Sequence, residues 1–246
     1  MLVTLTMFAV GTLLGFIGAG GAGFIIAILT LVFHVPIQVA LGTALASMAF
    51  TTLSATLGHF REGNISVRTG ILAGASGAVG AFCGSRIAAL VPAVQLHWFA
   101  TGMLFLSSLM LLLRLFIAKR IESSEKAASH HLLKSILLGL LTGILAGTFG
   151  IGSTPFIQIG LLVLLGLSLR QSVGTTMLVI LPIAIGGGVG YSVEGYLDIP
   201  LLFQVLLGTM TGAYLGSKFT RLAPPGILKA AMVMTPAVAG CLMLFE

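Results

Sequence analysis

Charged side chains are scarce in this sequence, because Asp, Glu, Lys and Arg together make up 7% of its 246 residues. A soluble domain carries about 25% of such residues, so this chain cannot cover itself with a hydrated surface. Hydrophobic residues form 57% of the chain, and the mean hydropathy is +1.15. Backbone polar groups in a lipid bilayer must be satisfied within the protein, which α-helices achieve. The composition therefore predicts an all-α polytopic membrane protein in contact with the lipid bilayer.

Cysteine is rare in the sequence, and the patterns of a metal site and of a signal peptide are missing. The two cysteines, Cys83 and Cys241, lie inside apolar segments, so we expect two buried thiols rather than a disulfide. No His, Cys and carboxylate group has metal-ligand spacing, and we expect no metal and no cofactor. No Lys or Arg precedes Arg61, whereas a secretory signal begins with a positively charged region, so we expect the first helix to begin at Met1. The net charge of +6 lies in loops and at helix ends, as in membrane proteins, which disfavours nucleic acid as a partner.

A glycine-rich stretch occurs twice and defines a repeat. Gly15–Phe24 reads GFIGAGGAGF, and Gly147–Phe156 reads GTFGIGSTPF, 132 positions later (147 − 15 = 132). Further matches follow at the same offset without a gap: Glu62-Gly63 with Glu194-Gly195, Gly80–Arg86 with Gly212–Lys218, and Pro92 with Pro224. These matches predict a duplicated unit, with an N-terminal repeat at 1–117, a cytoplasmic linker at 118–131 and a C-terminal repeat at 132–246.

Each repeat begins with a glycine-interrupted segment, Leu2–Phe33 in the first and Leu132–Leu167 in the second. Three apolar runs then follow in each repeat: Ile37–Leu57, Val67–Val91 and Leu96–Phe116, then Leu169–Val189, Ile199–Leu222 and Ile227–Phe245. Each run is long enough, at about 1.5 Å per residue, to cross a hydrocarbon core of about 30 Å. We therefore expect three transmembrane helices per repeat beside one re-entrant or broken helix.

The distribution of charge favours one of two topologies for the interrupted segments. If each segment crosses the membrane once, each repeat has four spans and the repeats are parallel. If each turns at its glycines and returns as a hairpin, the repeats have inverted topology. With the linker inside, the inverted arrangement places every Lys and Arg except Arg86 on the cytoplasmic side, and Glu194 and Asp198 outside. Cytoplasmic segments are enriched in Lys and Arg, so we expect inverted repeats in the cell (cytoplasmic) membrane with both termini outside.

The glycine-rich tips are candidates for a binding site, because paired interruptions in two halves point to the substrate site of a transporter. A helix that begins after each tip offers unpaired N–H groups and a partial positive charge, which suit an anion. No Asp or Glu lies within these segments, which disfavours a cation. The alternative is that the glycines serve only helix packing, and we prefer that role for Gly11, Gly15, Gly80, Gly84, Gly143, Gly147, Gly212 and Gly216. The candidate substrate-binding residues are Gly18, Gly20, Gly21, Gly23, Thr43, Ser47, Gly150, Gly152, Ser153, Thr154, Thr175 and Thr176.

Four residues near helix ends are candidates for gating or proton coupling: His59, Glu62, Arg86 and Lys218. Histidine as a residue type titrates near neutral pH, and Arg86 and Lys218 occupy the same repeat position. The alternatives are a solvated loop for His59 and Glu62, and long basic side chains that reach the membrane interface for Arg86 and Lys218.

The repeated G-x-G-(G/S) hairpin, the G-T pair on the next helix and the G-x-x-x-G-S-(R/K) run resemble the sulfite exporter TauE/SafE family over essentially the whole chain. The resemblance implies a transporter that exports sulfite, organosulfonates and related anions, without a cofactor. The chain departs from the family pattern at Ala44 and Thr176, which follow the two G-T pairs, and in the two tips, which read GAGGAG and GIGSTP. By motif match the functional positions would be Gly18, Gly20, Gly21, Thr43, Gly150, Gly152 and Thr175.

Three functions are compatible with these features. The first is an anion transporter that works by alternating access between the repeats. The second is a passive channel or permease for another small anion or solute. The third, an intramembrane enzyme with Ser153 as nucleophile, needs a nearby base, and no His lies at a matching depth in the expected spans, so we expect no enzyme. The identity of the anion, the direction of transport, the coupling ion and assembly into a homo-oligomer are left open by the residues.

Overall fold

The computed structural model describes residues 2–17, 22–121, 131–150, 153–220 and 225–244. Within these ranges every regular element is an α-helix, which confirms the expected all-helical class. The ten helices are α1 (Leu2–Ile17), α2 (Ala22–Leu31), α3 (Ile37–Arg61), α4 (Val67–Leu90), α5 (Ala93–Ile121), α6 (His131–Phe149), α7 (Thr154–Val163), α8 (Leu169–Val193), α9 (Ile199–Thr220) and α10 (Pro225–Leu244).

Six of the described helices are long and apolar enough to cross a membrane: α3, α4, α5, α6, α8 and α9. Five of them coincide with expected spans. The sixth expected span falls on α10, whose apolar stretch among the described side chains, Ala230–Leu244, is shorter. The additional long helix is α6, which is the first arm of the second interrupted segment. The protein is therefore a multi-pass membrane protein.

The short helices α2 and α7 follow the two glycine-rich tips. Each has 10 residues, which corresponds to about 15 Å of helix, half of a hydrocarbon core of about 30 Å. Neither helix can cross a membrane alone, as expected for the second arm of an interrupted segment.

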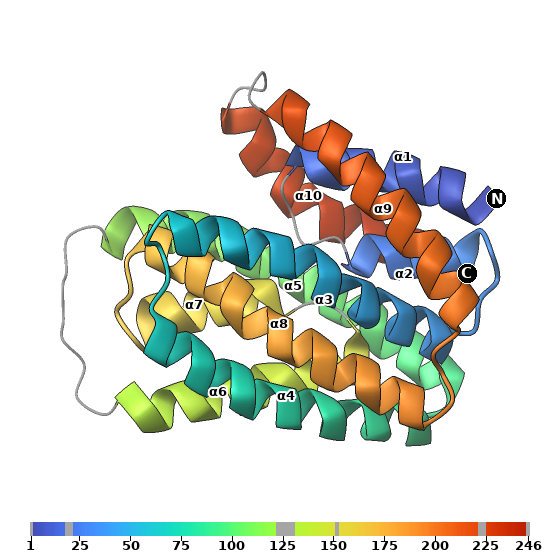
Figure 1. Ribbon diagram of the computed structural model, residues 1–246, viewed down its shortest axis with the longest axis horizontal. Helices are drawn as coiled ribbons and strands as arrows, with labels where there is room; N and C mark the ends of the chain where they lie inside the picture. Colours follow the sequence, from blue (N-terminus) through green and yellow to red (C-terminus); the bar gives the residue numbers. More distant parts are fainter. Residues whose placement is uncertain (1, 18–21, 122–130, 151–152, 221–224, 245–246) are drawn as a thin grey trace.

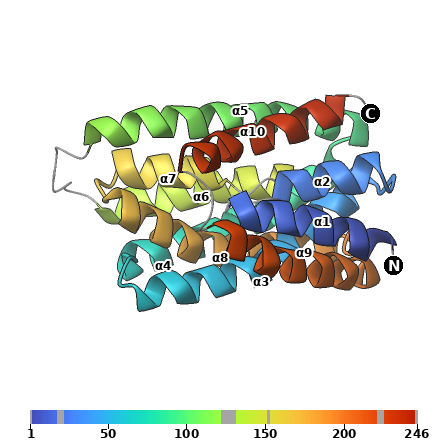
Figure 2. The ribbon, with the colours of Figure 1, turned by 90° about the horizontal axis from the view of Figure 1, so that it is seen from above.

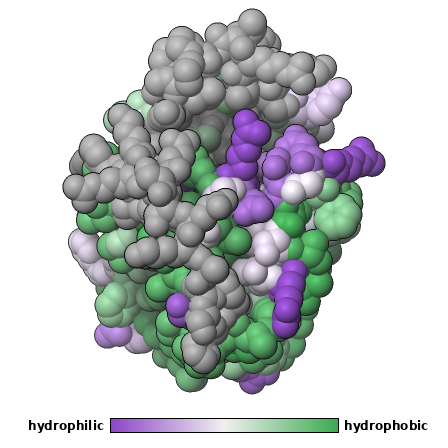
Figure 3. Space-filling model, turned by 90° about the vertical axis from the view of Figure 1, so that its left-hand side faces the viewer, coloured by the Kyte–Doolittle hydropathy of each residue, from purple (hydrophilic) through white to green (hydrophobic). Residues whose placement is uncertain are grey.

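The long helices lie side by side along the long axis of the molecule (Figure 1). Both chain ends lie at one end of the bundle, here called the terminal end (Figures 1 and 2). The helix α5 ends and α6 begins at the other end, here called the linker end. Figure 3 looks onto the linker end, where hydrophilic side chains gather among the hydrophobic ones.

Contacts at glycines give the relative directions of the central helices. Along α4, Gly70 lies on Leu178 of α8, and two turns later Gly77 lies on Ile183. Gly77 also contacts Gly143 of α6. Residue numbers rise in the same direction along α4 and α8 from one contact to the next. The two helices are therefore parallel, and both run from the linker end toward the terminal end.

Two pairs of helices, α1 with α9 and α4 with α6, approach so closely that their backbones touch. A methyl group added at Gly11 of α1 would lie 2.6 Å from the carbonyl oxygen of Thr209 on α9. At the equivalent repeat positions, Gly143 of α6 lies on the backbone of Gly77 of α4. Equivalent backbone contacts occur at Gly15, Gly212 and Gly216 in the α1–α9 pair and at Gly80, Gly84 and Gly147 in the α4–α6 pair. The expected packing role of these glycines is confirmed, and each close pair joins the first half of the chain to the second.

The outer surface is apolar, and it corrects one expectation from the sequence. Large hydrophobic side chains such as Leu90, Phe99 and Phe203 are exposed, which is the surface that lipid requires. Cys83 and Cys241 are free but exposed rather than buried. An apolar segment alone does not show which side of its helix faces lipid, because lipid and protein interior are both apolar.

The close helix pairs predict a sharp contrast between two Gly→Ala variants. In Gly80→Ala the new methyl would lie 2.5 Å from the carbonyl oxygen of Leu140, so two backbones must separate. We expect a loss of about 1–3 kcal/mol, typical of overpacking, seen as a lower unfolding temperature in detergent. The matched control is Gly102→Ala on α5, where a methyl meets no atom within 4 Å, and alanine favours the helix by up to about 1 kcal/mol. Equal stability of the two variants would contradict the packing role.

Candidate functional site

A cavity of about 140 Å³ lies between the two halves of the chain. It is smaller than the roughly 300–1,000 Å³ of pockets for drug-sized ligands, so it suits a small solute. Residues of α1, α2, α3, α7, α8 and α9 line it: Gly11, Leu14, Gly15, Ala22, Ile25, Ser47, Met48, Thr51, Thr52, Thr154, Met177, Ile180, Thr209 and Ala213.

The cavity lies halfway along the long helices. Its residues on α3, Ser47–Thr52, surround the middle of that helix, which extends from Ile37 to Arg61. Met177 and Ile180 lie near the middle of α8. A bundle that spans a bilayer would therefore hold this cavity near the membrane midplane.

Both short helices begin at the cavity. Ala22 is the first residue of α2 and Thr154 the first of α7, and both line it. The first N–H groups of a helix have no intrahelical acceptor, and they carry a partial positive charge. The cavity therefore receives two helix N-termini, one from each half of the chain.

The start of α7 leaves hydrogen-bonding groups unused. Ser153 is the N-cap residue, but its side chain makes no capping bond. Its hydroxyl is buried, with the residue 2% exposed, and has no hydrogen-bond partner among the described residues. Pro155 has no N–H, and Ile157 N–H already donates to the carbonyl of Ser153 (2.9 Å), so the N–H groups of Thr154 and Phe156 lack an intrahelical acceptor.

Several hydroxyl groups on the cavity wall donate to their own helices. Ser47 donates to the carbonyl of Ala44 (2.8 Å), Thr52 to that of Met48 (2.7 Å) and Thr209 to that of Val205 (2.7 Å). Each of these hydroxyls is thus satisfied within its own helix, and a rotation about its C–O bond would turn the proton toward a ligand.

The structure brings two candidate residues from the sequence, Ser47 and Thr154, together in the cavity. Three further hydroxyls of the cavity wall, at Thr51, Thr52 and Thr209, were not predicted. Two of them could have been found from the sequence by their helical spacing. Thr51 and Thr52 lie about one helical turn after the candidate Ser47.

The G-T pairs lie away from this cavity, near the two ends of the bundle. Gly174 lies on the backbone of Asn64, in the α3–α4 loop, and the hydroxyl of Thr175 accepts a hydrogen bond from Ser66 N–H (2.9 Å) in the same loop. The hydroxyl of Thr43 is buried without a described partner, and that of Thr176 donates to its own helix.

The remaining candidate residues fall into two groups. Gly23 packs on Leu104, and Gly150, whose φ is +63°, packs on Leu41. Gly18, Gly20, Gly21 and Gly152 lie outside the described residues, as does the side chain of Lys218.

The candidates for gating lie at opposite ends of the bundle. At the linker end, His59 Nδ1 is 3.7 Å from Glu62 Oε2. At the terminal end, Arg86 Nη1 is 3.4 Å from Glu194 Oε1. The guanidinium of Arg86 also lies 5.1 Å from the centre of the Phe82 ring.

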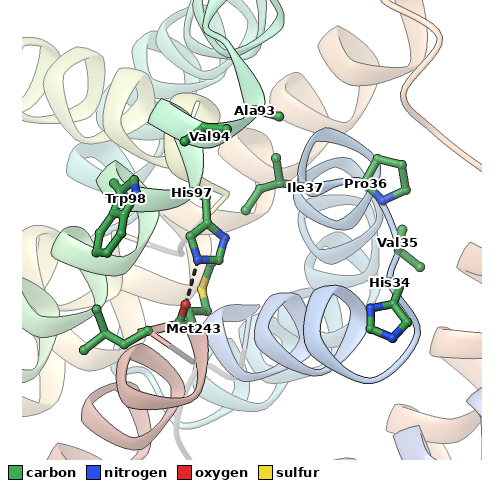
Figure 4. A pocket seen from close by; sticks show the side chains of 10 residues that line it. His34, Val35, Pro36, Ile37, Ala93, Val94, His97, Trp98 and Met243 are labelled. Carbon is green, nitrogen blue, oxygen red and sulfur yellow. Dashed lines mark hydrogen bonds between the residues drawn. The ribbon is translucent and has the colours of Figure 1, made fainter. Parts of the chain in front are cut away.

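A larger pocket of about 450 Å³ opens at the terminal end, away from the short helices' N-termini (Figure 4). His34, Ile37, His97 and Trp98 are among the residues that line it, and the ring of His97 donates through Nε2 to the carbonyl of Met243 (2.7 Å). Its lining is mostly apolar, and none of the candidate residues from the sequence lies in it.

Comparison with known proteins gives a consistent result. The family model described as "Sulfite exporter TauE/SafE" matches residues 3–243. The chain is 55% identical, over the full length of both proteins, to the probable membrane transporter protein YdhB of Bacillus subtilis strain 168. It is 24% identical to the probable membrane transporter protein YunE of the same strain, over all of this chain and 97% of the relative. No solved structure matches the chain. The chain is a member of the sulfite exporter TauE/SafE family of membrane transporters.

Proposed function

We propose that this transporter exports small sulfur-containing anions, such as sulfite or organosulfonates, by alternating access. The anion binds in the central cavity, between the first turns of α2 and α7. The observation that carries the proposal is that both helices begin at one small cavity halfway along the bundle. The family description supplies the class of substrate.

The chemistry of the cavity supports an anion over a cation. Among the described residues that line it there is no Asp or Glu, while five carry hydroxyl groups: Ser47, Thr51, Thr52, Thr154 and Thr209. A buried hydroxyl without a partner costs free energy, and an anion at the start of α7 would accept a hydrogen bond from Ser153. Several N–H and O–H donors around one site suit an oxyanion, which has several acceptor oxygens.

Inverted repeats are supported by three features of the arrangement. The chain ends lie opposite to the α5–α6 junction (Figure 1). Contacts at glycines advance in parallel along α4 and α8. Arg86 and Glu194 form an ion pair, whereas four-span parallel repeats would place these two residues on opposite faces of the membrane. In this topology α2 and α7 are the returning arms of hairpins that enter from opposite faces.

The distribution of basic residues supports a cytoplasmic linker end. Among the described side chains, Arg61, Arg68, Arg114, Lys134 and Arg170 lie on helix segments toward the linker end, and Arg86 lies at the terminal end. Cytoplasmic segments are enriched in such residues. With a negative interior, an anion gains about 2.3 kcal/mol per charge per 100 mV on leaving the cell, so export needs no coupling ion.

The binding site is tested by flux into proteoliposomes with sulfite, sulfate and sulfoacetate. We expect Thr154→Val and Thr209→Val to raise the half-saturating concentration roughly tenfold to hundredfold, because a hydrogen bond to a charged group contributes about 1.5–3 kcal/mol. The control is Thr211→Val, which changes an exposed residue two positions along the same helix. Saturation behaviour like that of the parent in both cavity variants would place the site elsewhere.

The same proteoliposomes separate a transporter from a passive channel. Alternating access predicts that unlabelled sulfite on one side accelerates the movement of labelled sulfite from the other. A flux that rises linearly with concentration and shows no such exchange would identify a channel.

The topology is tested with single cysteines at equivalent repeat positions, in a Cys83→Ala/Cys241→Ala background. Inverted repeats predict that Glu194→Cys reacts with an impermeant thiol reagent only from outside the cell, and Glu62→Cys only from the cytoplasm. Glu62 and Glu194 differ by 132 positions, so parallel repeats would label both from the same side, and that result would overturn the inverted arrangement.

A further inference from the structure

Tyr191 and His59 occupy the same position of the repeat, 132 residues apart. Each lies in the last turn of a long helix, Tyr191 on α8 and His59 on α3, and each is followed three residues later by a glutamate, Glu194 or Glu62. The two residues therefore lie at opposite ends of the bundle, where their surroundings can be compared directly.

At the terminal end, the Tyr191 side chain fills the space between three helices. The residue is fully buried, and its hydroxyl donates to the carbonyl of Gly147 on α6 (2.9 Å). It also packs against Gly42 of α3, where a methyl group would lie 2.9 Å from Tyr191 Cβ. A methyl at Gly42 would also lie 2.9 Å from the carbonyl oxygen of Tyr196, so this position has no room for a side chain.

At the linker end, the equivalent backbone contact is made, and the difference lies in the side chain. A methyl at Gly174 of α8, the equivalent of Gly42, would lie against the carbonyl oxygen of Asn64 and 3.3 Å from His59 Cβ. The His59 side chain is 30% exposed, and its described polar contact is with Glu62, the C-cap residue of α3. Among the described residues no hydrogen bond joins His59 Nδ1 to α1, whereas the Tyr191 hydroxyl is bonded to α6.

The cavity wall shows the same asymmetry. Thr51 and Thr52 of α3 line the cavity on its linker side. Their repeat equivalents on the terminal side, Ile183 and Ala184 of α8, are buried among other side chains. Hydroxyl groups of α3 therefore line the cavity on its linker side, whereas their equivalents on α8 do not line it on the terminal side, where Tyr191 lies.

We infer that Tyr191 and His59 are the two gate residues of the transport cycle, which act alternately. In this structure Tyr191 closes the terminal end. When the linker end closes, His59 moves against α1 and donates a hydrogen bond to the carbonyl of Gly15, the repeat equivalent of Gly147, while Tyr191 leaves α6. This inference rests on the proposed alternating access, to which it adds the residues that close each end.

Tyr191→Phe tests the terminal gate, because it removes the hydroxyl and keeps the ring. The reporter is Ser47→Cys in the Cys83→Ala/Cys241→Ala background, with an impermeant thiol reagent applied to one face of oriented vesicles. The parent should be labelled mainly from the linker end. Tyr191→Phe should raise labelling from the terminal end about fivefold, the equilibrium factor of one typical hydrogen bond.

His59→Tyr tests the linker gate independently, and it should lower labelling from the linker end about fivefold, because it supplies the side chain that closes the other end. The control for both is Tyr196→Phe, which removes a tyrosine hydroxyl in the α8–α9 loop. Each variant tests one gate by itself. If one variant misfolds, the labelling of the other still tests the gate assignment.

The outcomes separate the gates from transport itself. If exchange of sulfite across the membrane persists while both gate variants label like Tyr196→Phe, the gate assignment is wrong and alternating access stands. Equal labelling of the parent from both faces also overturns the gate assignment. If the parent shows saturable flux without exchange, alternating access fails and the gates fail with it.

Discussion

Backbone contact between helices is the constraint on which the architecture depends. In lipid, helices are not driven together by the hydrophobic effect, so close van der Waals packing at small residues takes its place. The glycines of the α1–α9 and α4–α6 pairs provide this packing. Each pair takes one helix from each half of the chain, so the two halves interlock. This leaves α2 and α7 in the interior, where the ends of short helices can face a cavity rather than lipid.

Polar side chains in the interior depend on hydrogen bonds within the protein. Many buried threonines and serines donate to a carbonyl of their own helix, as Thr30, Thr142 and Thr209 do. Such bonds leave no unsatisfied donor in an apolar medium. The hydroxyl of Ser153 is one of a few buried hydroxyls without a described partner, and Ser153 is the N-cap residue of α7, whose first residue, Thr154, lines the cavity.

Much of the fold could be read from the sequence, because hydropathy marks the long helices and the 132-residue offset marks the repeat. Helix faces could not be read in the same way. Lipid and protein interior are both apolar, so no pattern placed Cys83 on the surface, and none turned Thr209 toward the cavity. The packing of the G-T pairs could not be read either. Gly42 contacts Tyr191 and Thr175 binds the α3–α4 loop, contacts between segments distant in sequence that only the folded chain reveals.

The two chain ends lie together at one end of the bundle (Figure 2). This position bears on whether the connectivity of the chain can be changed. The close contacts at the described glycines of the two halves are made by helices packed side by side. A circular permutant that opens within 118–131 and joins the old ends through a flexible connector would keep each helix beside its present neighbours. These helix contacts therefore do not require the present order of the halves along the chain.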